Sequence, residues 1–177
     1  MKLEEVLAGI DNHIWSSELD VAYFLQALIK MMKAECVIEC GTFKGLISSH
    51  IINAMKDGSG FIGIDIEDHR CESVKRYMSE NNSKFMLESS ITALRKLPKR
   101  SADIIFIDSL HEISYLRSEF KAAESVIRQD GIICLHDTYI PDIMEWINYI
   151  RTMNWFEVIC LETSEGRGIG VIKCLMS

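Results

Sequence analysis

The sequence lacks the features that mark several classes of protein. It has only two prolines among 177 residues, and no apolar run approaches the roughly 18 residues of a membrane-spanning helix. Its formal net charge of -7 leaves no basic stripe for nucleic acid. Its six cysteines are scattered, and none forms the CxxC pair typical of zinc and redox sites. We therefore expect no membrane segment, no nucleic-acid partner, and reduced thiols that pack as small apolar groups.

No repeat, low-complexity run or change of composition divides the chain. Its length fits one domain, and its 48% of hydrophobic residues is enough for a core. Glu4 and Glu5 stand where a secretory signal would be apolar. We expect a cytoplasmic protein with a single domain over residues 1–177, made of an N-terminal helical segment (1–34) and a core (35–177).

Short apolar runs alternate with segments of helical spacing along most of the chain. The expected strands span 36–40, 61–66, 84–87, 103–108, 131–136, 156–162 and 168–175, and the expected helices span 17–33, 46–55, 71–80, 90–97, 112–129 and 141–153. Such alternation is typical of parallel strands joined by helical crossovers, whereas the last two strands lack an intervening helix and predict an antiparallel hairpin. The predicted fold class is α/β, with a Rossmann-like, doubly wound, mostly parallel seven-stranded sheet that ends in this hairpin.

The loop after the first expected strand carries the first candidate ligand site. Residues 39–45 read ECGTFKG, in which two glycines let the backbone approach a ligand next to a helix N-terminus. Asp65 ends the second strand about 20 residues later, where an acid can bind ribose hydroxyls, and Glu67 and Asp68 are alternatives. The spacing is ExGxxxG rather than the GxGxxG that cradles a pyrophosphate. It therefore favours a nucleoside with a small charged tail.

Three segments together resemble one enzyme family. Residues 39–45 are similar to the first motif of class I S-adenosylmethionine-dependent methyltransferases, particularly the small O-methyltransferase-like branch. Residues 107–111 (IDSLH) and 131–138 (GIICLHDT) resemble the pattern "IDGxH … GGxIxxHDT" of the methyltransferase-24 group. The resemblance spans about residues 35–173. It implies an S-adenosylmethionine-dependent methyltransferase that acts on a small molecule, and we expect a hydroxyl oxygen as the acceptor.

The resemblance also assigns residues to the cofactor. It implies that the methionine part of S-adenosylmethionine is surrounded by Glu39, Gly41, Thr42, Phe43 and Gly45. The remaining contacts would be Asp65 with ribose, Ile66 against adenine, Ser90 and Ile91 at the adenine edge, and Asp108 beside the sulfonium. Residues 11–18 and 139–145 occupy the places where such folds build the walls of the acceptor site.

Two acids and two histidines are expected at the reacting end. Asp108 and Asp137 end strands that should be neighbours, about 4.8 Å apart, so that their carboxylates share one cleft. With His136 they are candidate ligands of a divalent metal such as magnesium, which would activate a substrate hydroxyl, although the nitrogen of His136 suits zinc or iron better. Related enzymes have an asparagine where Thr138 stands. Asp108 and His111 are the expected catalytic pair, with His111 as general base; a histidine that only caps the following helix or hydrogen-bonds a loop is the alternative.

Other functions and states stay open at this stage. N-methylation, a non-catalytic S-adenosylmethionine-binding protein and an NAD-dependent oxidoreductase are the alternatives, of which the missing GxGxxG disfavours the last. A homodimer that closes the pocket is an alternative to a monomer. His50 is expected on a helix surface, in a surface or packing role, because no partner motif surrounds it.

Overall fold

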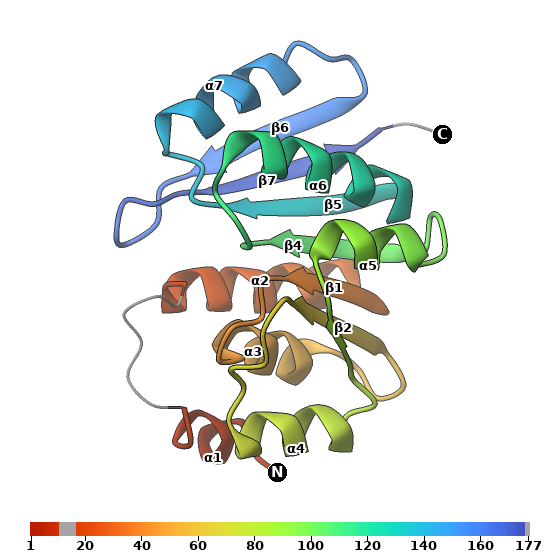
Figure 1. Ribbon diagram of the computed structural model, residues 1–177, viewed down its shortest axis with the longest axis vertical. Helices are drawn as coiled ribbons and strands as arrows, with labels where there is room; N and C mark the ends of the chain where they lie inside the picture. Colours follow the sequence, from red (N-terminus) through yellow and green to blue (C-terminus); the bar gives the residue numbers. More distant parts are fainter. Residues whose placement is uncertain (11–16, 176–177) are drawn as a thin grey trace.

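The computed structural model describes residues 1–10 and 17–175 (Figure 1). Within this part of the chain the elements follow one another as α1 (Leu3–Leu7), α2 (Leu19–Met32), β1 (Cys36–Cys40), α3 (Leu46–Ala54), β2 (Gly60–Asp65), α4 (Glu72–Glu80), β3 (Lys84–Leu87), α5 (Ser90–Lys96), β4 (Ala102–Ile107), α6 (Ile113–Val126), β5 (Ile127–His136), α7 (Pro141–Ile150), β6 (Phe156–Leu161) and β7 (Ile169–Cys174). The predicted alternation of strands and helices is present.

All strands belong to one seven-stranded sheet in the order β3-β2-β1-β4-β5-β7-β6. Strands β1 to β5 pair in parallel, and β7 runs antiparallel to both β5 and β6 (Figure 1). The prediction of a mostly parallel sheet with a terminal antiparallel hairpin is confirmed. The chain reverses its direction of winding between β1 and β4, and open α/β sheets bind ligands at the carboxyl ends of the strands beside such a point.

Helices cover both faces of the sheet. Helices α1 to α4 pack on one face and α5 to α7 on the other, each over its own apolar cluster. Strand β4 is fully buried and alternates between the two clusters, since Ile105 and Ile107 face one while Ile104 and Phe106 face the other. This two-sided burial is the reason why the central strands read as continuous apolar runs.

Most element boundaries lie within three residues of those expected, and the largest difference is at the start of β5. Strand β5 begins at Ile127, within the segment expected to be helical, because Ala102 pairs with Ile127 and the register then shifts before Ile104 pairs with Ile132. Helix α1 is a five-residue element that no periodicity could indicate. It is fixed by tertiary contacts, since Val6 is completely buried. For the described part of the chain, no helix is long and apolar enough to cross a membrane.

His50 lies in the core and not on the surface, so that expectation was wrong. Helix α2 packs on α3 and covers the ring, which is 3% exposed and meets Tyr23 edge to face at 5.7 Å between centroids. Among the described residues, neither ring nitrogen has a hydrogen-bond partner. Burial lowers the pKa of His50 below its ordinary value. The folded protein therefore holds a neutral imidazole here.

This burial predicts a loss of stability in mild acid. As the pH falls through the ordinary histidine pKa of about 6.5, the unfolded chain takes up a proton that folded His50 does not, so the free energy of unfolding decreases. We expect His50→Leu to remove this part of the pH dependence and to be neutral or up to about 1 kcal/mol stabilising at neutral pH. Urea unfolding from pH 5 to 7.5 tests it, with exposed His69→Leu as the control. Equal slopes for wild type and His50→Leu would contradict the prediction.

Asp103 joins the amino ends of β1 and β4. Its Oδ2 accepts the backbone N–H groups of Glu35 and Cys36 at 2.6 and 2.7 Å, and its Oδ1 pairs with Arg128 Nε at 2.5 Å. The Asp103 side chain is 7% exposed, whereas that of Arg128 is 48% exposed. The carboxylate therefore satisfies backbone groups at the end of the sheet opposite the crevice.

We expect Asp103→Ala to lower the free energy of unfolding by about 2–3 kcal/mol, because it leaves two backbone donors without their acceptor. Arg128→Ala is the matched control and should cost less than about 1 kcal/mol, since the Arg128 side chain is 48% exposed and Asp103 keeps both backbone donors without it. Urea denaturation followed by circular dichroism measures both. Similar costs for the two variants would show that the backbone hydrogen bonds are not what Asp103 contributes.

Candidate functional site

The site lies at the carboxyl ends of β1, β2, β4 and β5. The turn after β1 begins with Gly41, which has a φ of 93° and packs directly on the chain that leaves β4. A Cβ atom at Gly41 would lie 2.0 Å from the carbonyl oxygen of Asp108. Gly45, with a φ of 85°, ends the same turn and begins α3. Gly41 thus allows this turn to approach the end of β4 closely, whereas Gly45 lies against the Val74 side chain of α4.

Three carboxylates surround this turn. Glu39 at the end of β1 is 1% exposed and accepts a hydrogen bond from the Ser48 hydroxyl of α3. Burial raises the pKa of Glu39 well above its ordinary value, and the charges of Asp108 and Asp65 raise it further. Asp65 accepts the Phe43 N–H at 2.7 Å, so the turn is also tied to the end of β2. The crevice is therefore acidic.

The other candidate cofactor residues have different environments. Thr42 is buried against β2, with its hydroxyl 3.5 Å from the Ile64 carbonyl oxygen, so it presents backbone rather than side chain to the crevice. Ile66 is 68% exposed directly after Asp65. Ser90 is buried and shares a 2.9 Å hydrogen bond with Tyr115, while Ile91 is half-buried. The structure thus leaves apolar surface next to the acid at the end of β2.

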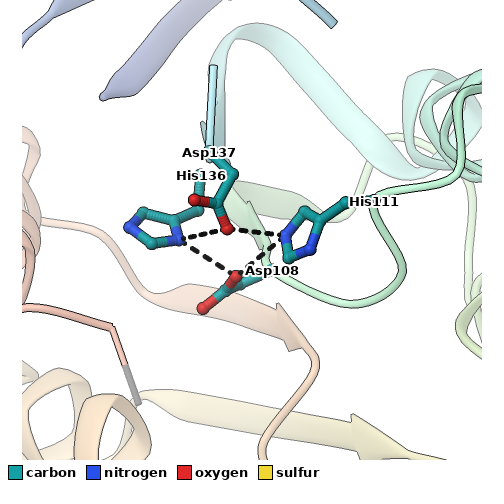
Figure 2. Close-up of side chains that lie close together, drawn as sticks. All are labelled: Asp108, His111, His136 and Asp137. Carbon is teal, nitrogen blue, oxygen red and sulfur yellow. Dashed lines mark hydrogen bonds and ion pairs between the residues drawn. The ribbon is translucent and has the colours of Figure 1, made fainter. Parts of the chain in front are cut away.

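Four side chains meet beside the crevice, at the ends of β4 and β5 (Figure 2). Asp108, His111, His136 and Asp137 each offer a ligand atom, and these atoms all lie within 4.8 Å of one another. His111 Nε2 is 2.9 Å from Asp137 Oδ2 and 3.5 Å from Asp108 Oδ1. His136 Nδ1 is 3.1 Å from Asp108 Oδ1 and 3.2 Å from Asp137 Oδ2. The predicted acids and histidines are therefore brought together.

Ion pairing shifts the pKa of every member of this cluster. Hydrogen bonds to Asp108 and Asp137 raise the pKa of His111 to about 9. Burial alone would lower the pKa of His136, but the same two carboxylates raise it to about 10. Burial opposes ionisation of the two aspartates, yet their pKa values are lowered by His111 and His136. Without a ligand the cluster therefore holds charged imidazolium and carboxylate groups at neutral pH.

Two residues ahead of α2 also reach the cluster. Ser17 donates a hydrogen bond to Asp108 Oδ2, and Glu18 Oε2 lies 2.7 Å from His136 Nε2. Both residues are buried, whereas the rest of the expected wall segment, residues 11–16, lies outside the described residues. Sequence reasoning missed Ser17 and Glu18 because a Ser-Glu pair ahead of a helix indicates only a helix start.

Thr138 does not face the four-residue cluster. It is completely buried, and a Cβ atom at Gly168 would lie 2.6 Å from its hydroxyl oxygen. Its methyl group likewise faces Gly170 of β7. Thr138 therefore packs on the terminal hairpin and leaves the cluster to the aspartates and histidines.

The family of the chain follows from a match to a family model. A family model described as "Methyltransferase domain" matches residues 38–138, which contain the turn after β1, β4 and the end of β5. The chain belongs to this methyltransferase family. The resemblance to class I methyltransferases seen in the sequence is thereby confirmed. No curated protein matches the chain.

Solved structures share the methyltransferase fold over almost the whole chain. An O-methyltransferase from Bacillus cereus in complex with SAH is 17% identical, with a TM-score of 0.77 over 97% of this chain and 90% of its own. Cofactor-bound Rv0187 from MTB is 12% identical, with a TM-score of 0.79 over 99% and 90%. The O-methyltransferase TomG from Streptomyces achromogenes, involved in tomaymycin synthesis and in complex with SAM, is 14% identical, with a TM-score of 0.73 over 98% and 89%. At these identities the likeness establishes the fold.

Proposed function

We propose that this methyltransferase binds S-adenosylmethionine at the carboxyl ends of β1, β2 and β4 and methylates a small molecule at a hydroxyl oxygen. The main support for this proposal is that Asp108 belongs to both the cofactor turn and the reactive cluster. Its backbone closes on Gly41, and its carboxylate is one corner of the cluster with His111, His136 and Asp137. The reactive end of a cofactor in the crevice would thus lie beside groups that can move a proton. The SAH and SAM complexes of the Bacillus cereus protein and TomG support this choice of cofactor.

The charge of the crevice fits this cofactor. S-adenosylmethionine carries a cationic sulfonium, and the carboxylates of Asp65 and Asp108 lie at the Gly41 turn. A pyrophosphate would meet like charge there, which disfavours NAD. The exposed side chain of Ile66 supplies an apolar surface for adenine. The whole chain, 1–177, would serve as one methyltransferase domain.

The proposed contacts follow the order of the strands. The methionine part would lie among Glu39, Gly41, Thr42, Phe43 and Gly45, with Thr42 contributing its backbone. Asp65, held by the Phe43 N–H, would bind the ribose, and Ile66, Ser90 and Ile91 would border the adenine. Asp108 would lie beside the sulfonium.

The chain's own role in the reaction is to position the acceptor and to accept its proton. The acceptor oxygen would bond to the methyl carbon while the sulfur keeps the electron pair of the broken bond, and the hydroxyl proton would pass to His111. At a pKa of about 9, His111 already holds a proton while both carboxylates face it. It therefore becomes a base once Asp108 and Asp137 engage another partner.

The same two aspartates fit a divalent ion. Asp108 Oδ1 and Asp137 Oδ2 converge with His136 Nδ1, all three within hydrogen-bonding distance of a neighbour in the ring of Figure 2. A divalent ion bound there supplies Lewis acidity that lowers the pKa of a coordinated hydroxyl. Asp108, Asp137 and His136 would hold it, and His111 would be left to take the proton.

Calorimetry with S-adenosylhomocysteine and with NAD tests the cofactor. We expect S-adenosylhomocysteine to bind and NAD not to bind; the reverse would indicate an oxidoreductase. A methyl-transfer assay with hydroxyl and amine acceptors, with and without chelator, then tests the reaction. Methyl transfer to amines alone would show that the acceptor atom is nitrogen and not oxygen. Cofactor binding without transfer to any acceptor would indicate a non-catalytic protein.

A further inference from the structure

We propose that the site selects a nitrogen-binding first-row ion, such as Fe²⁺, Co²⁺ or Zn²⁺, over Mg²⁺, and that Glu18 is the positioning residue that makes His136 its nitrogen ligand. This inference rests on the proposed function, since it concerns the ion that would serve the same reaction. It departs from an all-oxygen site because the position after Asp137 is Thr138, which faces the hairpin.

The three proposed ligand atoms have the spacing of a metal site. His136 Nδ1 is 3.1 Å from Asp108 Oδ1 and 3.2 Å from Asp137 Oδ2. Ligands bound to zinc at its usual bond lengths lie about 3.4 Å apart in a tetrahedron. His111 Nε2 is the fourth atom of the cluster, but its side chain is 37% exposed and lies in the loop after β4. With His111 kept as the base, three buried or half-buried ligands remain beside an open position, as in catalytic rather than structural zinc sites.

The chemistry of the ligands favours nitrogen-binding ions. Mg²⁺ prefers oxygen ligands and keeps several waters, whereas imidazole suits iron, cobalt and zinc. His136 cannot turn away from the site, because its side chain is 1% exposed and both of its ring nitrogens are engaged. Any ion held by Asp108 and Asp137 therefore has an imidazole nitrogen next to it.

Glu18 fixes which nitrogen that is. Its Oε2 lies 2.7 Å from His136 Nε2, and the side chains of the pair are 2% and 1% exposed. A carboxylate at Nε2 accepts the N–H there, so that Nδ1 is the nitrogen that faces the cluster and would bind an ion in place of its proton. A carboxylate behind a metal-bound histidine also orients the ring and strengthens it as a ligand.

Glu18 is itself held in place by the loop between β6 and β7 of the terminal hairpin. Its Oε1 accepts the Thr163 hydroxyl at 2.7 Å. The Thr163 oxygen in turn accepts the N–H groups of Arg167 and Gly168 at 3.1 and 2.9 Å. The neighbouring Ser17 engages Oδ2 of Asp108, so that Oδ1 is the Asp108 oxygen that faces His136 and His111. Residues 17 and 18 thus orient one oxygen and one nitrogen ligand.

The experiment measures binding of Co²⁺ and Mg²⁺ to the full chain by calorimetry, with the visible spectrum of Co²⁺ as a report of nitrogen ligation. We expect wild type to bind Co²⁺ at least about tenfold more tightly than Mg²⁺. Glu18→Gln should weaken Co²⁺ binding about 10- to 100-fold and change its spectrum, while Mg²⁺ affinity changes little. Thr163→Val, which frees Glu18, should weaken Co²⁺ binding in the same sense and provides a second test if Glu18→Gln does not fold.

Asp20→Asn is the matched control. Asp20 is an acid of the same helix start and accepts the Ser164 N–H at 2.7 Å, but it does not touch the cluster, so the variant should keep wild-type affinity for Co²⁺. Absence of Co²⁺ binding, tighter binding of Mg²⁺, or equal loss in Glu18→Gln and Asp20→Asn would overturn the inference. S-adenosylhomocysteine binding is measured on the same samples. If wild type binds Co²⁺ but not S-adenosylhomocysteine, the result counts against the proposed function. If wild type binds S-adenosylhomocysteine but shows no preference for Co²⁺ over Mg²⁺, only the inference is overturned.

Discussion

Gly41→Ala is expected to destabilise the protein by about 4 kcal/mol or more, because two penalties coincide at this position. The residue has a φ of 93°, which disfavours any side chain. The new Cβ would also lie 2.0 Å from the Asp108 carbonyl oxygen and 3.0 Å from the Ser109 nitrogen. Both obstacles are backbone atoms of the chain leaving β4, so no side-chain rotation relieves the clash.

Gly58→Ala separates the two penalties. Gly58 has a φ of 86°, but a Cβ atom there would have no atom of the described residues within 4 Å, so this variant should cost only about 1 kcal/mol. Urea unfolding followed by circular dichroism compares both with wild type. Any folded Gly41→Ala protein should also bind S-adenosylhomocysteine weakly, because its turn is displaced from Asp108. Equal unfolding midpoints for the two variants would contradict the close approach of the turn to β4.

The sheet could be predicted because its strands are buried on both faces. The segment 102–107 is apolar except for Asp103, and strands that follow one another through a helical crossover usually lie side by side. The same rules place the ends of β4 and β5 side by side, so the meeting of Asp108 with Asp137 was predictable as well. The local sequence pattern and the rules of strand connection are thus enough to predict the crevice and the two aspartates in it.

Contacts between residues far apart in the chain could not be predicted in this way. Glu18 and His136 are 118 positions apart, and Glu18 and Thr163 are 145 apart. His50 has a helical spacing that fits a surface as well as an interface, and only the packing of α2 on α3 buries it. Such side chains carry no periodicity, because their surroundings come from other elements.

The two acids of β4 and its end have different roles, which depend on their position along the strand. Asp103 and Asp108 lie at opposite ends of β4, and both are largely buried. Asp103 is saturated by backbone N–H groups and an arginine, so its loss should affect folding and not S-adenosylhomocysteine affinity. Asp108 is paired with histidines and a serine at the edge where ligands bind. Neither role is visible from residue type alone.

His111 is the residue whose replacement should most reduce turnover. It is the exposed member of the cluster, 2.9 Å from Asp137 and 3.5 Å from Asp108, on the loop that joins β4 to α6. Helix α6 begins at Ile113 with Glu112 as its cap residue, so the alternative left for His111 is a histidine that only hydrogen-bonds Asp137. His111 is therefore the proposed base, which would act on an acceptor once the aspartates are engaged elsewhere.

We expect His111→Ala to lower turnover about 100-fold or more at saturating S-adenosylmethionine, with S-adenosylhomocysteine affinity unchanged, because general-base catalysis is lost. His111→Asn is the sharper variant, since an amide keeps a hydrogen bond to Asp137 but cannot accept the proton at neutral pH. Both variants should fail equally in single-turnover methyl transfer. Recovery of turnover by His111→Asn would show that His111 only orients Asp137, and unchanged turnover in His111→Ala would exclude it as the base.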